Sequence, residues 1–161
     1  MRIEQVMTSS PVSCKPGHSL SRAAQVMWSH DCGCLPVTPD DGSQQVVGVI
    51  TDRDICMAAH FKGKRLSEIL VAEVMTRDVW SCNPGDSLGE AEAIMREAHV
   101  RRLPVVGRRD RLLGLLSLAD LAREAVWQHG SAKPQISEAE VGIVLAMICQ
   151  PRSISRPAPD E

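Results

Sequence analysis

Residues 74–105, VMTRDVWSCNPGDSLGEAEAIMREAHVRRLPV, decide the fold, because they repeat residues 6–37, VMTSSPVSCKPGHSLSRAAQVMWSHDCGCLPV, without a gap. Of these 32 aligned positions, 14 carry the same residue. Self-similarity at a fixed spacing is the signature of a duplicated structural unit. The chain therefore predicts two copies of one fold, related by a shift of 68 residues.

Downstream of this stretch the duplication continues with a shift of 66 residues. The two-residue difference falls in residues 38–45, which are rich in Pro, Asp, Gly and Ser. That composition is typical of a surface turn, where changes of length are tolerated. The new shift aligns a glycine, a hydroxyl residue and an acid of each copy, namely Gly48, Thr51 and Asp54 with Gly114, Ser117 and Asp120.

Each copy predicts the element order β-α-β-β-α. An extended lead-in segment ends at Pro-Gly, apolar residues then recur at helical spacing, and two short apolar strands and a closing helix follow. Because one copy alone leaves an apolar sheet face open, the two should bury these faces against each other. The sequence thus predicts an α/β (α+β) fold, a pseudo-twofold pair of repeats with a cleft between them. The expected ranges are 6–13, 20–28, 35–38, 46–50 and 52–60 in the first copy, and 74–81, 88–98, 103–106, 112–116 and 118–129 in the second.

The chain divides into four parts. We expect the first repeat over 1–60, a connector over 61–73, the second repeat over 74–129, and a C-terminal helix with a flexible tail over 130–161. The C-terminal helix is indicated by a capping box, in which Ser137 is followed three residues later by Glu140. One face of this helix should carry Val141, Val144, Leu145 and Ile148, as a contact with its own chain or with a partner.

Composition excludes several classes of function. Among the 161 residues, 43% are apolar and 24% charged, and the formal net charge is −2. A nucleic-acid-binding domain usually carries a basic excess, so no nucleic acid is expected as the ligand. No stretch approaches the ~20 apolar residues of a membrane span, and residues 1–8 lack the apolar core of a signal peptide. We therefore expect a cytoplasmic protein that does not bind a membrane, with its six cysteines reduced.

The segments 48–54, GVITDRD, and 114–120, GLLSLAD, sit where a strand should end and a helix begin. One interpretation is structural, since a hydroxyl residue and an acid three positions later cap a helix. The other is functional. A glycine allows close backbone approach, a helix N-terminus attracts phosphate, and a carboxylate accepts the hydroxyls of a ribose. The two interpretations are compatible, and both stay open.

The repeats resemble the CBS domain, which occurs as tandem pairs called Bateman modules. The V-M-T lead-in, the L-P-V strand and the motif Gly, two apolar residues, Thr or Ser, two residues, Asp recur in order in both copies, over about residues 6–126. The chain is especially similar to small stand-alone bacterial CBS-pair proteins. This resemblance implies a regulatory ligand between the copies (AMP, ADP, ATP, NAD or S-adenosylmethionine), no catalytic cofactor, and a homodimer shaped as a disc that signals to an unknown effector protein.

The resemblance also implies two sites, each built from both copies. Asp54 and Asp120 would bind ribose hydroxyls, with Thr51 and Ser117 beside them. Because Arg53, Arg101 and Arg102 can pair with phosphate oxygens, the Asp54 site is expected to prefer the more phosphorylated ligand. The first site would gather Thr51, Arg53 and Asp54 with Thr76, Ser81, Val100, Arg101 and Arg102. The second would gather Ser117 and Asp120 with Thr8, Ser13, Cys32, Gly33 and Cys34.

Two other readings stay open. A metal or thiol sensor could use His30, Cys32, Cys34 and Cys14, although their spacing is not that of a CxxC pair. The equivalent positions of Cys14 and Cys82 favour packing instead. A ligand-free interaction module would use the two acids as caps alone. An enzyme is disfavoured, because the sequence has no P-loop, HExxH or GxSxG motif.

Overall fold

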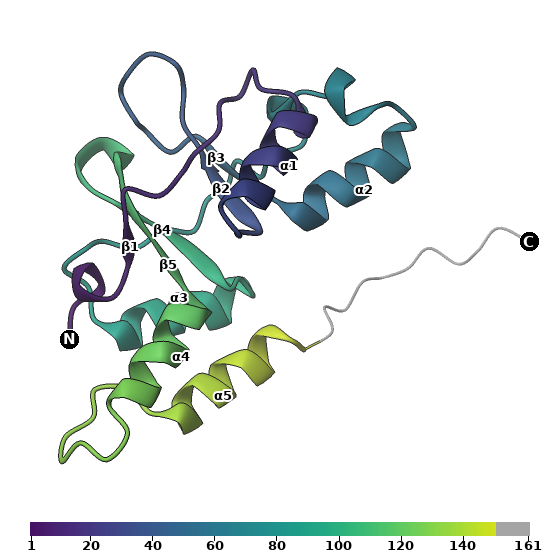
Figure 1. The fold of residues 1–161 in the computed structure, drawn as a ribbon. Coiled ribbons are helices and arrows are strands. Elements are labelled where there is room, and N and C mark those ends of the chain that lie inside the picture. The colour runs from purple at the N-terminus through teal and green to yellow at the C-terminus, as the bar shows by residue number, and fades with distance from the viewer. Residues whose placement is uncertain (151–161) are drawn as a thin grey trace, which may run out of the picture.

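The structure is a computed structural model that describes residues 1–150. Its elements follow the predicted order, so the expected mixed α/β (α+β) fold is confirmed (Figure 1). The first copy contributes β1 (Thr8–Ser9), α1 (Leu20–Ser29), β2 (Cys34–Val37), β3 (Gly48–Thr51) and α2 (Asp52–Lys62). The second contributes α3 (Leu88–Ala98), β4 (Arg102–Val106), β5 (Leu112–Ser117) and α4 (Leu118–Trp127), and α5 (Glu138–Ile148) follows.

The helices begin where the sequence supplies an N-cap. Ser19 Oγ accepts a hydrogen bond from the backbone N–H of Arg22 at 3.3 Å, and Ser87 Oγ accepts one from Glu90 at the equivalent place, also at 3.3 Å. Ser137 begins α5 in the same way, as its capping box predicts. Such caps satisfy backbone N–H groups that the first helical turn leaves without partners.

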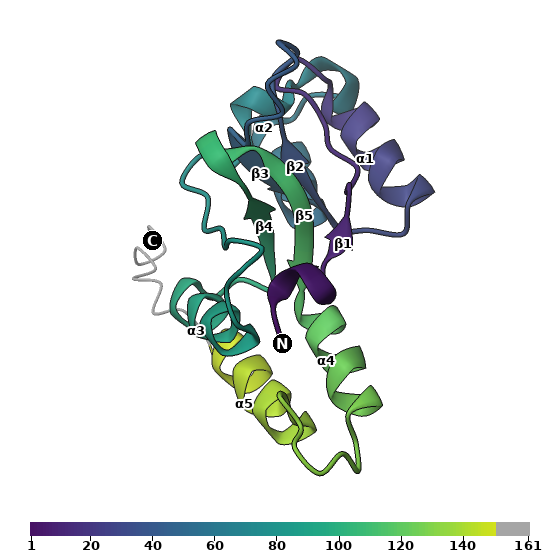
Figure 2. The ribbon, with the colours of Figure 1, turned by 90° about the vertical axis from the view of Figure 1, so that its left-hand side faces the viewer.

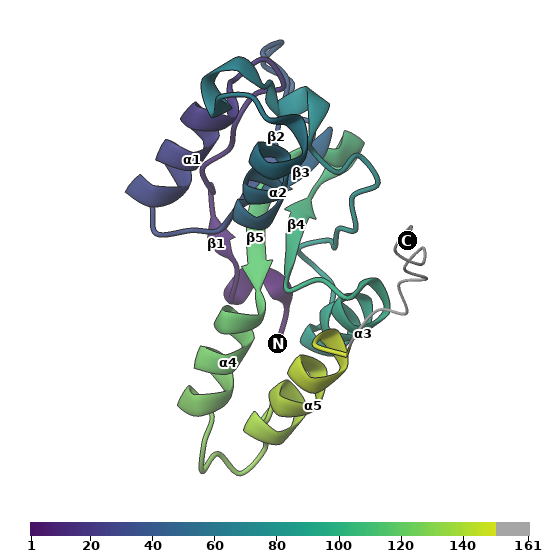
Figure 3. The same cartoon turned by 90° about the vertical axis from the view of Figure 1, so that its right-hand side faces the viewer.

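The strands form two antiparallel sheets. β2 pairs with β3 alone, whereas β5 lies between β1 and β4 (Figures 2 and 3). The second lead-in segment differs from the prediction, since Thr76 makes only an isolated bridge to Val49 in place of a strand. Two backbone hydrogen bonds of 2.9 Å form this bridge, which is too short a ladder to count as a strand.

The lead-in segments cross between the copies. The backbone N–H of Ile3 donates to the backbone carbonyl of Asp86 at 3.0 Å, and the Ile3 side chain is buried in the core of the second copy. Val71, its equivalent 68 residues later, donates to the backbone of His18 at 2.9 Å and is buried in the core of the first copy. β1 likewise pairs with β5 of the second copy. The two halves are therefore interlocked.

Each half has its own apolar core, and α5 extends only the second. Val141, Val144 and Ile148 pack with residues of α3 and α4 (Figure 2). Leu145 was expected on the same face, but it is 42% exposed. Leu145 lies about 40° around the helix from Val141, at the edge of the face that α3 and α4 cover. In the described residues, 1–150, no helix has the length and apolar character needed to span a membrane.

Candidate functional site

The two predicted corners have the same geometry. At the first, Asp54 Oδ2 accepts hydrogen bonds from the backbone N–H and the hydroxyl of Thr51, at 2.8 and 2.7 Å, while Thr51 Oγ1 accepts one from the backbone of Asp54. At the second, Asp120 Oδ2 accepts the same pair of bonds from Ser117, at 2.8 and 2.6 Å. Both motifs are therefore capping boxes, as the structural interpretation expected.

The second carboxylate oxygen distinguishes the corners. Asp120 Oδ1 accepts a hydrogen bond from the guanidinium of Arg123, which lies one turn further along α4. Asp120 is only 7% exposed, whereas the Arg123 side chain is 66% exposed. At Asp54, every hydrogen bond described within residues 1–150 that involves the side chain uses Oδ2. The cap thus occupies one oxygen of each acid and leaves the other for a different partner.

A cavity of about 420 Å³ opens beside the second corner, and both copies line it. Of the residues predicted for this site, Ser117, Asp120, Thr8, Cys32 and Cys34 lie around it. The sequence analysis assigned Arg102 to the other site and named His30 only as a candidate metal or thiol-sensor residue. It assigned no site role to the remaining lining residues, which are Ser10, Pro11, Val12, Asp31, Leu115, Ala119 and Arg123.

Two residues predicted for this site lie elsewhere. Ser13 Oγ is 3.2 Å from the Thr38 hydroxyl and does not line the cavity. Gly33 borders a neighbouring cavity instead. A β-carbon at Gly33 would come within 2.7 Å of Asp52 Oδ2, so the exposed Asp52 side chain would have to move to admit one.

The predicted residues around Asp54 line neither of the two cavities, with the exception of Arg102, which lines both. Thr76 is hydrogen-bonded to Val49, two residues before Thr51, and so lies near this corner. Arg101 instead donates from Nη2 to Cys149 Sγ at 3.1 Å. The gathering of Thr51, Arg53, Asp54, Thr76, Ser81, Val100 and Arg101 into one ligand site stays a prediction.

Arg123 could have been found from the sequence. It follows Asp120 by three residues on a helix, and side chains at this spacing are neighbours. Arg102 reaches the same cavity because it lies opposite Ser117 in the β4–β5 ladder. Two arginines therefore line the same cavity as an acid at the start of a helix, an arrangement suited to an anionic ligand that also carries hydroxyl groups.

Cys14 and Cys34, two of the four candidate metal or thiol-sensor residues, are buried. Burial raises the pKa of Cys34 to about 12 and that of Cys14 to about 11, so both thiols stay protonated near neutral pH. His30 Nδ1 lies 2.9 Å from the carbonyl oxygen of Val26. Over residues 1–150, no three His, Cys, Asp or Glu side chains are grouped closely enough to hold a metal ion. Cys14 and Cys82 are both buried in the cores, as their equivalence suggested.

The profile of the CBS domain matches this chain twice, over residues 3–60 and 71–126. The chain belongs to the CBS domain family. CBS domain-containing protein YhcV of Bacillus subtilis is 33% identical in an alignment of 142 residues that covers 86% of this chain and 97% of YhcV. The tandem pair seen in the sequence is thereby confirmed as a pair of CBS domains.

Solved structures of CBS proteins share the fold. Hypoxic Response Protein I, crystallised with two coordinated zinc ions, superimposes with a TM-score of 0.69 at 30% identity, covering 76% of this chain and 98% of its own. CBSX2, crystallised in complex with AMP, gives a TM-score of 0.69 at 25% identity over 80% of this chain and 98% of its own. CBSX2 thus shows that a CBS pair of this fold can hold a nucleotide.

Proposed function

We propose that this CBS pair is a regulatory module that binds an adenine nucleotide in the cavity beside Asp120. The observation that carries the proposal is the joint lining of that cavity by both CBS domains, with a carboxylate at a helix N-terminus and two arginines around it. A ligand held there contacts both copies and so favours one relative placement of them. The AMP complex of CBSX2 supports this class of ligand.

The ribose and the phosphates would take different parts of the cavity. Asp120 Oδ1 would accept a ribose hydroxyl in place of the Arg123 bond, and Arg123 would then be released toward the phosphate. Arg102 offers a second guanidinium from the facing strand. Guanidinium–phosphate pairs are charge-assisted and stronger than neutral hydrogen bonds. We therefore propose that the Asp120 site, rather than the Asp54 site, prefers the phosphorylated ligand.

The Asp54 corner is proposed as the second, weaker site, built from Thr51, Arg53 and Asp54 with Thr76, Ser81, Val100, Arg101 and Arg102. Identification of the ligand that co-purifies with the protein decides among AMP, ADP, ATP, NAD and S-adenosylmethionine. We further propose that the module is not an enzyme, and that it works as a homodimer that passes its signal to an effector protein. The equivalent chemistry of the two corners supports two related ligand positions.

Calorimetric titration of the full chain with AMP, ATP and adenosine tests the proposal. Asp120→Asn keeps an acceptor for the cap but removes the ionised carboxylate. It should weaken AMP binding at least about tenfold, because a hydrogen bond to a charged group contributes ~1.5–3 kcal/mol. Asp54→Asn is the matched control and should weaken the main binding event far less. Equal binding by the wild type and both variants would disprove the assignment.

A thermal melt separates this function from a ligand-free interaction module. A nucleotide present at one hundred times its Kd should raise the free energy of unfolding by about 2.7 kcal/mol. If no adenine compound raises the melting temperature, the capping role of the two acids is their whole role. Mass spectrometry of ligands released from the purified protein then identifies any natural occupant.

A further inference from the structure

Arg102 and Cys34 occupy equivalent positions of the two copies, 68 residues apart. Both nevertheless line the same cavity, the one beside Asp120. The duplication relates Cys34 to Arg102, and it relates the Asp120 corner to the Asp54 corner. Because Cys34 borders the Asp120 site, its equivalent Arg102 should border the Asp54 site, in addition to the cavity that it lines beside Asp120.

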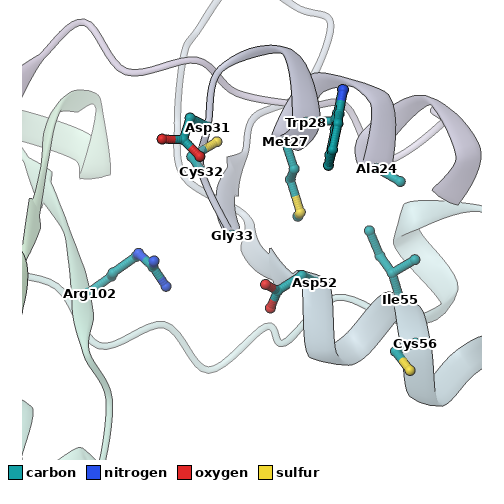
Figure 4. Close-up of a pocket in the computed structure, with 10 residues that line it drawn as sticks. All are labelled: Ala24, Met27, Trp28, Asp31, Cys32, Gly33, Asp52, Ile55, Cys56 and Arg102. Carbon is teal, nitrogen blue, oxygen red and sulfur yellow. The ribbon is translucent and has the colours of Figure 1, made fainter.

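The direction of the Arg102 side chain agrees with this central position. It extends from β4 of the second copy toward Gly33 and Asp52 of the first, and all three residues line one cavity (Figure 4). Asp52 is the first residue of α2, and so it belongs to the first corner. Burial is the main cause of the raised pKa of Cys34, the charge of Arg102 lowers this pKa, and the charges of Asp54 and Asp52 raise it. The guanidinium and the acids of the first corner thus surround the same thiol.

Each corner also has one arginine of its own. At the second corner this is Arg123, which is paired with Asp120. At the first it is Arg53, the equivalent of Ala119, and Ala119 lines the Asp120 cavity. In residues 1–150, by contrast, no ion pair engages Arg102. A guanidinium binds a phosphate best through two parallel N–H···O bonds, so Arg102 can serve only one phosphate at a time in this way.

We infer that the two corners share Arg102, so that a phosphorylated ligand bound beside Asp120 weakens the binding of a second one beside Asp54. The inference rests on the proposed function and deepens it. A phosphate at the Asp120 site draws the guanidinium away from the other corner, and it adds a negative charge nearby, which repels a second anion. The coupling is reciprocal, because each ligand changes the affinity for the other by the same factor.

The test compares the affinity of the Asp54 site for AMP while the Asp120 site is occupied and while it is empty. In a calorimetric titration of the full wild-type chain, the second binding step reports the occupied case. The double variant Asp120→Asn with Arg123→Met reports the empty case, because its Asp120 site has lost both the carboxylate and its own arginine. The Asp54 site of the double variant should bind AMP about tenfold more tightly than the second step of the wild type, the equivalent of ~1.4 kcal/mol.

Arg102→Met identifies the shared residue. When it is added to both proteins, the Asp54 site should bind AMP with the same affinity whether its neighbour is occupied or empty. Arg108→Met is the matched control, because Arg108 is exposed and lines neither cavity, and it should preserve the tenfold difference. Adenosine carries no phosphate and makes no demand on Arg102, so its affinity for the Asp54 site should be the same in the wild type and the double variant.

The outcomes separate this inference from the proposed function. A wild type that binds no AMP overturns the proposed function itself. Two binding steps, with equal affinity of the Asp54 site in the wild type and the double variant, overturn the coupling and leave nucleotide binding in place. A tenfold difference that persists after Arg102→Met overturns the role of Arg102. One AMP per wild-type chain, and none on a double variant that still melts cooperatively, also overturns the inference, because the Asp54 corner then binds no nucleotide.

Discussion

The first and second CBS domains share the same order of helices and strands and differ in single side chains at equivalent positions. Their corners use the same capping box, with nearly the same distances. In the second domain, however, Arg123 stands where the first has Met57, and Glu92 stands where the first has Ala24. Caps and cores thus preserve the fold of both copies, while single side chains around them give each copy its own chemistry.

The largest expected loss of stability comes from truncating a side chain that one copy buries in the core of the other. Ile3→Ala removes a fully buried side chain and should lower the free energy of unfolding by about 2–5 kcal/mol. Although Ile3 belongs to the first copy in sequence, hydrogen exchange should accelerate first in α3 and β4 of the second. Val71→Ala, at the equivalent position, should instead accelerate exchange in α1 and β2. If Ile3→Ala instead accelerated exchange first in α1 and β2, and Val71→Ala first in α3 and β4, the result would contradict the crossed packing.

An exchange of side chains between the corners sharpens the comparison of the sites. Arg123→Met gives the Asp120 site the residue of the Asp54 site, and it should weaken AMP binding about tenfold, the equivalent of ~1.4 kcal/mol. Adenosine binding should not weaken, because adenosine lacks phosphate and Arg123 no longer competes for Asp120 Oδ1. Met57→Arg should strengthen AMP binding at the Asp54 site. Parallel titrations of both ligands measure this; equal losses for adenosine and AMP in Arg123→Met would count against a phosphate role.

The smallest effect concerns Glu92 on α3. Its buried Oε1 has no hydrogen-bond partner in the described residues. Burial, and then the negative charge of Glu140 on α5, raise the pKa of Glu92 above its ordinary 4.5, while Arg96 partly offsets the rise. A raised carboxyl pKa means that the charged form is disfavoured in the fold. The resulting cost is absent below about pH 4.5 and grows as the pH rises through the raised pKa.

At pH 8, Glu92→Gln should therefore have a free energy of unfolding about 0.5 kcal/mol higher than the wild type after solvent screening, and so unfold at a slightly higher denaturant concentration. Near pH 4 the two proteins should unfold at the same denaturant concentration. Ala24→Glu, at the equivalent position of α1, faces no α5 and should show little of this dependence. Urea unfolding at both pH values provides the measurement. A Glu92→Gln variant that gains nothing at pH 8 would show that water reaches the carboxylate.

Much of the fold could be predicted from the sequence because its signals are local. The duplication, the apolar periodicity and the caps at Thr51, Ser117 and Ser137 each act within a few residues. The departures are non-local. The exposure of Leu145 depends on where α3 and α4 meet α5, and the shortness of the second lead-in bridge depends on where Thr76 meets β3.

The candidate site was predicted less completely, for the same reason. Ser117 and Asp120 were found from their motif, and the resemblance to CBS pairs placed Thr8 and Cys32 opposite them. The position of Arg102 depends on the ladder between β4 and β5, which brings it to the cavity beside Asp120. Arg123 was missed although its spacing from Asp120 is helical, because the motif ends at the acid.

The crossing of the lead-in segments has a consequence for cutting and grafting this protein. A protease that cleaved after Gly63 would sever the polypeptide but leave two pieces that each hold part of the other's interior, Ile3 in one and Val71 in the other. The pieces should stay associated as a nicked complex. A single repeat excised at the boundary of its own motif would lack the residue that seals it, so the smallest unit that can be transplanted into another protein is the pair.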